Sequence, residues 1–134
     1  MAIMDPHRIP SGRAHLDEHD RQRLLRLELL VADGRFDEAQ ETAEGLWLEA
    51  NDAHKLLYQG LSNALTAVCA RQARQLRGAR QIADATRSML APFPRRVLDL
   101  ELDVLLDSVR DFVLRGEGPI LLRRQGGGQA QAQG

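Results

Sequence analysis

The fold is decided by the segment FDEAQETAEGLWLEA, residues 36–50, in which a helical apolar period and several polar side chains occur together. At about 100° per residue, one stripe carries the apolar side chains Phe36, Ala39, Ala43, Trp47 and Ala50. Gln40 lies inside that stripe, and Glu44 lies at its edge one turn further along. Glu41 points away, toward solvent or a neighbouring helix. The segment therefore predicts an amphipathic helix that turns polar groups toward the interior.

Composition limits the class of protein. A chain of 134 residues is expected to form one domain, and 43% hydrophobic with only 4% aromatic residues predicts a helical core of Leu, Ala and Val. Cys69 is the single cysteine, so no intrachain disulfide can form, and a cytoplasmic location is expected. Neither a signal peptide nor a membrane span is apparent, and a net charge of −1 argues against a globally basic nucleic-acid binder.

Four further segments repeat apolar residues at helical spacing: 17–34, 52–74, 79–90 and 99–116. We predict an all-α, single-domain bundle of about five helices. The helix at 52–74 is predicted to be central, because apolar residues cover about half its circumference and Gly60 lets a neighbour approach. Leu25, Leu29 and Ala32 give the first helix a second apolar face. Gly78 is expected to mark a break or a tight contact.

The domain organisation follows from the ends of the chain. Residues 1–15 contain prolines and glycine without a usable period, which predicts a flexible arm. Residues 16–116 should form the helical bundle. Residues 117–134 read as an extended, disordered tail rich in glycine and glutamine. The sequence shows no internal repeat.

The short link after residue 50 predicts that the second and third helices are antiparallel neighbours. Gln40 should then lie level with Asn63, and Glu44 level with Gln59. We call these four residues, together with Trp47, the polar seam. Its members either satisfy one another, since an unpaired buried polar group costs about 1–3 kcal/mol, or form a site. In a site, Glu44 would be the general base and Glu41 the second candidate catalytic residue.

No cofactor and no metal site are predicted. The four histidines fall at His7, His15, His19 and His54, away from helix interiors. Cys69 has no partner at the spacing that a metal site requires.

Charge is segregated along the chain. Residues 17–54 hold eleven acids against four arginines, and residues 71–96 hold seven arginines against one aspartate. A basic patch is predicted at Arg71, Arg74, Arg77, Arg80 and Arg87. It would either contact the phosphates of a nucleic acid, or pair with acids of the first two helices in the same or a second subunit.

The runs DGRFDEAQETAEGLW, YQGLSNALTAV, RGAR and LDLELDVLLDSV resemble, in this order, small helical bacterial and archaeal proteins called domain of unknown function 309. The resemblance implies a helical fold with a pocket at Gln40 and Glu44. Where that family has a histidine before its first glutamate, this chain has Gln40. The histidines that end the family's next helix fall near Cys69 and Ala70. Groups that would bind a metal or move protons in relatives are therefore replaced here.

Three functions follow from these observations. The first is a non-enzymatic module that binds itself or another protein, because charge is segregated and no complete catalytic constellation is present. The second is a hydrolase-like or other small-molecule enzyme that uses the carboxylates of Glu41 and Glu44. The third is a weak nucleic-acid binder that acts through residues 71–96. A membrane partner is not expected.

Overall fold

A computed structural model of the chain describes residues 18–50 and 53–122. The helices, in chain order, are α1 (Glu18–Ala32), α2 (Phe36–Glu49), α3 (Lys55–Gln72), α4 (Leu76–Leu90) and α5 (Leu102–Arg115). Between α4 and α5, the short strands β1 (Arg96–Val97) and β2 (Leu100–Glu101) pair in antiparallel register. The predicted all-α bundle of five helices is confirmed, with this small hairpin added. None of the described helices is both long and apolar enough to span a membrane.

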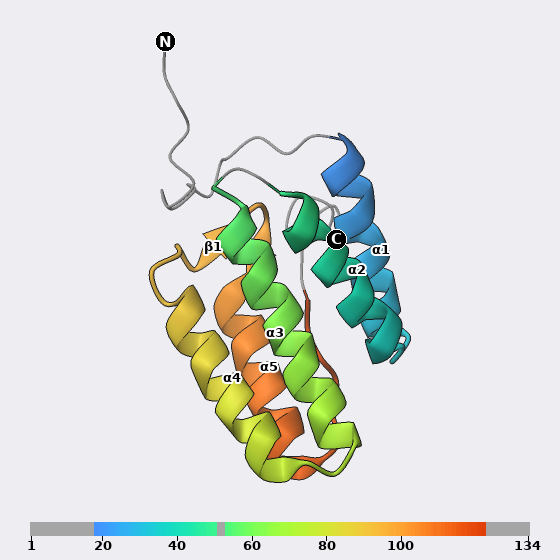
Figure 1. Cartoon of the computed structure of the whole chain (residues 1–134), viewed down its shortest axis with the longest axis vertical. Helices are drawn as coiled ribbons and strands as arrows, with labels where there is room; N and C mark the ends of the chain where they lie inside the picture. The colour runs from blue at the N-terminus through green and yellow to red at the C-terminus, as the bar shows by residue number, and fades with distance from the viewer. Residues whose placement is uncertain (1–17, 51–52, 123–134) are drawn as a thin grey trace, which may run out of the picture.

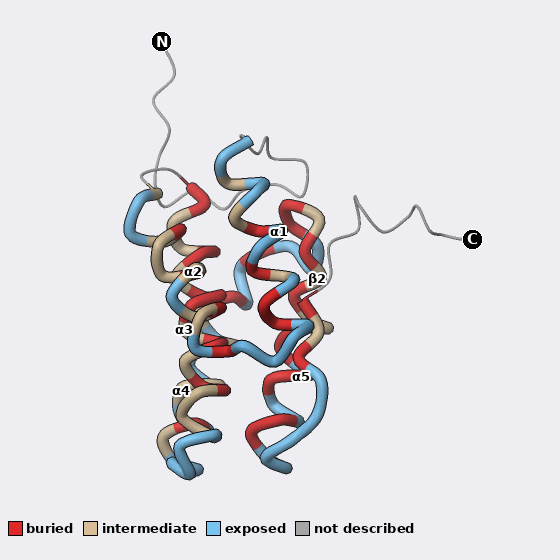
Figure 2. The backbone as a smooth tube through the Cα atoms, turned by 90° about the vertical axis from the view of Figure 1, so that its right-hand side faces the viewer, coloured by how far each residue is buried: buried red, intermediate tan, exposed pale blue. Residues whose placement is uncertain are grey.

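Helix α3 occupies the centre of the bundle, as predicted. It packs against α2 on one side and against α4 and α5 on the other, whereas α1 packs mainly against α2 (Figure 1). Half of the residues of α3 are therefore buried and nearly all the others are partly buried, while α1 shows alternating buried and exposed turns along its length (Figure 2). This arrangement makes α1 an edge helix.

Leucine, alanine and valine side chains fill the core, and a few aromatic residues make specific contacts between helices. The ring of Phe36 on α2 meets that of Phe112 on α5 edge to face, with centroids 5.7 Å apart. Tyr58 on α3 is fully buried, and its hydroxyl donates a hydrogen bond to Asp20 Oδ2 at 3.0 Å. These contacts tie α1 and α5 to the inner helices.

Gly60 and Gly78 have opposite surroundings. A Cβ added to Gly60 would lie 2.4 Å from Leu90 Cδ2, so the glycine allows α3 and α4 to approach closely, as predicted. A Cβ on Gly78 would meet nothing within 4 Å. Both predicted alternatives for Gly78 are wrong: there is no break, because α4 begins at Leu76 and Gly78 lies in its first turn, and no described residue makes a tight contact with it.

The connection between α1 and α2 is repeated forty residues later between α3 and α4. Both turns contain one residue in the left-handed region, Gly34 with φ 76° and Arg74 with φ 64°. In both, that residue donates its backbone N–H to the carbonyl three residues before it, and the next residue donates to the carbonyl five before it. These pairs are Gly34 to Val31 and Arg35 to Leu30, then Arg74 to Arg71 and Gln75 to Ala70. The structure therefore contains two helical hairpins of one design, a repeat that the sequence conceals.

The bundle extends beyond its predicted end at residue 116. After α5 the chain runs back along that helix (Figure 1), and the Leu121 N–H donates to Ser108 Oγ at 3.0 Å. Ile120 and Leu122 are buried in the core. The predicted start of a disordered tail at residue 117 is therefore wrong. The predicted arm at 1–15 and the remainder of the tail, 123–134, lie outside the described residues.

The start of α5 also differs from the prediction. Asp99, the expected N-cap of that helix, lies instead in the turn of the hairpin, with φ 65° after Leu98 at φ 51°. Both central residues of this two-residue turn are left-handed, which is the geometry that joins strands in tight hairpins. The helix begins three residues later, at Leu102.

Candidate functional site

The polar seam joins α2 to α3 through hydroxyl groups. Gln40 Nε2 donates to Ser62 Oγ at 3.3 Å and lies 3.4 Å from Thr66 Oγ1. The predicted pairing with Asn63 is not formed, because the Asn63 amide turns toward α4, where its Nδ2 lies 3.8 Å from Met89 Sδ. Thus α3 presents its Ser62 and Thr66 edge to α2.

The other members of the seam lie at its margin. Glu44 and Gln59 are half-buried, and no hydrogen bond joins them within the described part of the chain. Trp47 is also half-buried and packs against the edge of the core, whereas Leu46, 1% exposed, takes the inner position. Glu41 is exposed. The structure therefore brings Gln40 to partners on α3 but does not gather Glu41 and Glu44 around it.

Lys55 closes the end of α2 next to the seam. Its Nζ donates to the carbonyl oxygens of Trp47 at 3.0 Å and of Ala50 at 3.1 Å. A cation at this position satisfies carbonyls that the helix leaves without partners. The sequence carries one signal for this contact, because Lys55 is the only lysine of the chain and follows a helix end closely.

The five arginines of the predicted basic patch do not act as a group. Arg71 Nε donates to the Val113 carbonyl at 2.8 Å, and its guanidinium packs against Gly116, whose left-handed φ ends α5. Arg87 pairs with Asp107 of α5 at 2.9 Å. The partners of these two arginines therefore lie on α5, not on the first two helices as expected. Arg74, Arg77 and Arg80 are exposed.

Cys69 lies on α3 beside Asp37 of α2. Burial, together with the nearby Asp37 carboxylate, raises the pKa of the thiol to about 12. The thiol is therefore protonated at neutral pH, the form that is neither nucleophile nor metal ligand. Across residues 18–50 and 53–122, no three His, Cys, Asp or Glu side chains are grouped as a metal site requires.

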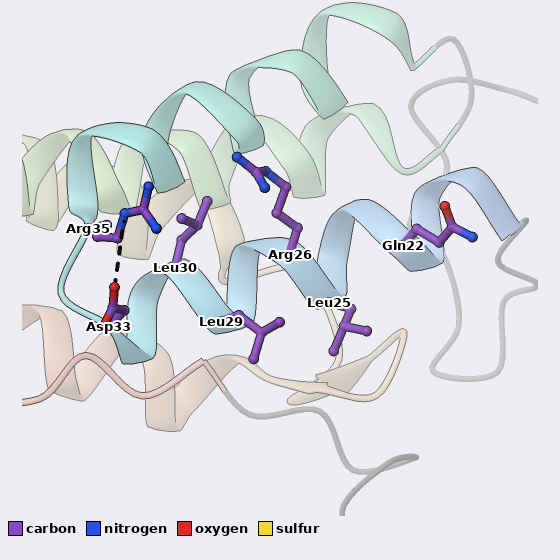
Figure 3. A pocket seen from close by; sticks show the side chains of 7 residues that line it. All are labelled: Gln22, Leu25, Arg26, Leu29, Leu30, Asp33 and Arg35. Atoms are coloured by element: carbon purple, nitrogen blue, oxygen red, sulfur yellow. Dashed lines mark ion pairs between the residues drawn. The ribbon is translucent and has the colours of Figure 1, made fainter.

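The outer face of α1 combines exposed leucines with a groove, and sequence reasoning did not identify it as a site. Leu25 and Leu29, one turn apart, are 48% and 62% exposed. An open groove of about 480 Å³ runs along this helix (Figure 3). It is lined by Gln22, Leu25, Arg26, Leu29, Leu30, Asp33 and Arg35. The signal was present in the second apolar face of this helix, formed by Leu25, Leu29 and Ala32.

Charged groups of both signs border this groove. Leu25 and Leu29 project from one side of α1, while Arg26 and Arg35 point toward the α2 side (Figure 3). Arg35 Nε lies 4.0 Å from Asp33 Oδ2, and Arg35 Nη2 donates to Glu38 Oε1 at 2.6 Å. The Glu38 carboxylate raises the pKa of the Arg35 guanidinium. A leucine strip between acids and arginines has the chemistry of a contact surface for a protein helix.

Comparisons with protein-family models, with curated proteins and with solved structures gave no match. The relation to domain of unknown function 309 therefore stays a prediction from the sequence.

Proposed function

We propose that this chain is a non-enzymatic helical module that acts by binding protein, a second copy or another chain, through the outer face of α1. The observation that carries this proposal is the exposure of Leu25 and Leu29 on an edge helix beside an open groove. Apolar side chains grouped on a surface and rimmed by polar groups mark interaction sites. The free face of an edge helix also leaves room for another helix to pack.

The other candidate sites support the same proposal. In the polar seam, the Gln40 amide and the hydroxyls of Ser62 and Thr66 satisfy one another, which favours the structural interpretation over a substrate site. In the basic patch, Arg71 and Arg87 are engaged in packing α5. A cytoplasmic location belongs to the proposal too and is supported by the single cysteine, Cys69, which leaves the chain without an intrachain disulfide.

Site-specific photocrosslinking tests the proposal. A benzophenone amino acid in place of Leu29 is expected to give a discrete protein adduct, in the purified chain or in cells, because the side chain lies on the contact face. The matched control replaces Glu41, which is also exposed but lies on α2. Failure to form any adduct at position 29, or equal adducts at both positions, would rule out α1 as the binding face.

A further inference from the structure

We propose that the face of α5 around Ser108 is a binding groove for an extended apolar peptide, and that residues 117–122 of the chain itself occupy this groove as a releasable strap. The groove lies on α5, so the inference goes beyond the proposed function and does not depend on the outer face of α1. A partner protein binds here by placing an extended segment of its own where the strap now lies.

The strap shows which kind of ligand the groove accepts. Ile120 and Leu122 are buried in the core, at 5% and 7% exposed, whereas Leu121 between them is only partly buried. This alternation is that of an extended chain, in which every second side chain points to the same side. The Leu121 N–H donates to Ser108 Oγ, which in turn donates to the Leu105 carbonyl at 2.8 Å. The ligand is therefore an extended segment with apolar side chains at positions i and i+2 and a backbone N–H between them for Ser108.

The strap is held by its two buried side chains and by very little of its backbone. Within the part of the chain that the structure describes, the contact with Ser108 is the one hydrogen bond that joins residues 117–122 to the bundle. Glu117, Gly118 and Pro119 are exposed. Segments with few buried contacts open more readily than the body of a domain. The strap can therefore leave α5 while the helices stay folded.

Two glycines provide a hinge at the start of the strap. Gly116 ends α5 with φ 81°, and Gly118 follows with φ 120°. Both values lie in the region that glycine adopts at low cost. A Cβ added to Gly118 would meet nothing within 4 Å, so the chain has room to move at this position. Rotation at these two residues moves residues 119–122 away from α5 without disturbing the helix.

The groove extends beyond the part that the strap fills. An open space of about 330 Å³ remains between α5 and the strap. The α5 residues that line it include Val104, Ser108, Asp111 and Arg115, which recur at steps of three and four and so form one stripe along the helix. A segment with larger side chains than those of the strap therefore has space to bind.

Hydrogen exchange of the wild-type chain tests whether the strap opens independently. After correction for intrinsic rates, the Leu121 amide should exchange at least about tenfold faster than the amide of Leu61 inside α3, because opening of the strap does not require the bundle to unfold. If both amides exchange at the same protected rate, through global unfolding, the strap is a fixed part of the core and the inference is overturned.

Binding of the strap sequence in trans tests the groove. The I120S/L122S double variant removes the two side chains that hold the strap and leaves α5 unchanged. A fluorescent peptide of residues 116–124, GEGPILLRR, should bind this variant at least about tenfold more tightly than the wild type, whose own strap competes at high effective concentration. Fluorescence anisotropy measures both affinities. The same peptide with serine in place of its isoleucine and of its last leucine should not bind.

Two further variants separate the groove from other surfaces. L114S removes an exposed apolar side chain of α5 outside the strap and should bind the peptide no better than the wild type. Adding S108A to the double variant should weaken peptide binding roughly fivefold, because the peptide N–H loses its acceptor. A folded double variant that does not bind the peptide, or equal binding by L114S, overturns the groove. A double variant that is unfolded by circular dichroism overturns the releasable strap, because the helices would then depend on it.

Discussion

Leu27→Ala is expected to lower the free energy of unfolding by about 2–5 kcal/mol. Leu27 is fully buried on the inner face of α1, where its side chain packs into the core shared with α2. Removing it deletes apolar contacts and leaves a cavity that the surrounding helices fill only partly. Urea denaturation followed by circular dichroism measures the change.

Leu29→Ala is the matched control, because the same substitution on the same helix removes a side chain that is 62% exposed. At protein concentrations low enough to prevent association, it should change stability by less than about 0.5 kcal/mol. Equal losses for both variants would mean that α1 is rotated about its axis. The outer face would then not be the contact surface.

Gly60→Ala is expected to destabilise the protein by about 1–3 kcal/mol, although alanine favours helices more than glycine does. The new Cβ would lie 2.4 Å from Leu90 Cδ2 and 2.7 Å from its Cγ, so α3 and α4 must separate or Leu90 must leave its rotamer. The loss of stability is measured by the same denaturation experiment.

Gly78→Ala provides the opposite case. It adds the same methyl group within α4, where nothing lies within 4 Å of the new atom. The remaining effect is that alanine favours a helix more than glycine does, so this variant should be more stable by about 0.5–1 kcal/mol. If Gly60→Ala also proved stabilising, the close contact between α3 and α4 would be wrong.

Periodicity was sufficient to predict the helices that bury one clear face. The bounds of α2 and the central place of α3 follow from apolar spacing, which reflects burial directly. The turn before α4 escaped prediction because Arg74 takes the left-handed position that Gly34 occupies in the first hairpin. A glycine signal marks one copy of the turn and is missing from the other. The repeat was hidden for the same reason.

Two other elements lacked a local signal altogether. The hairpin turn uses Leu98 and Asp99, where asparagine and glycine are usual. Ile120 and Leu122 are two apolar residues in an otherwise polar segment, and their burial depends on the surface of α5 that they cover. Such contacts are tertiary, so neither composition nor spacing could predict them.

The candidate sites were predicted to the level of a helix face but not to the level of a partner. Gln40 turns toward α3 as predicted, but its amide donates hydrogen bonds to Ser62 and Thr66 and not to Asn63. Adjacent residues on a helix point about 100° apart, so a one-residue error in the facing edge of α3 changes every pairing. Likewise, the sequence showed two leucine faces on α1, and only packing against α2 decides which stays exposed.

The outer face of α1 is tested most directly as a binding face by a spin label placed beside the exposed leucines. A nitroxide at position 22, introduced through Q22C in a C69S background, lies on the lining of the groove. If protein binds this face, the label should lose mobility as the concentration of the chain or of cell extract rises, whereas the same label at exposed position 41 on α2 should keep its mobility. Equal behaviour of the two labels at every concentration would contradict binding through α1.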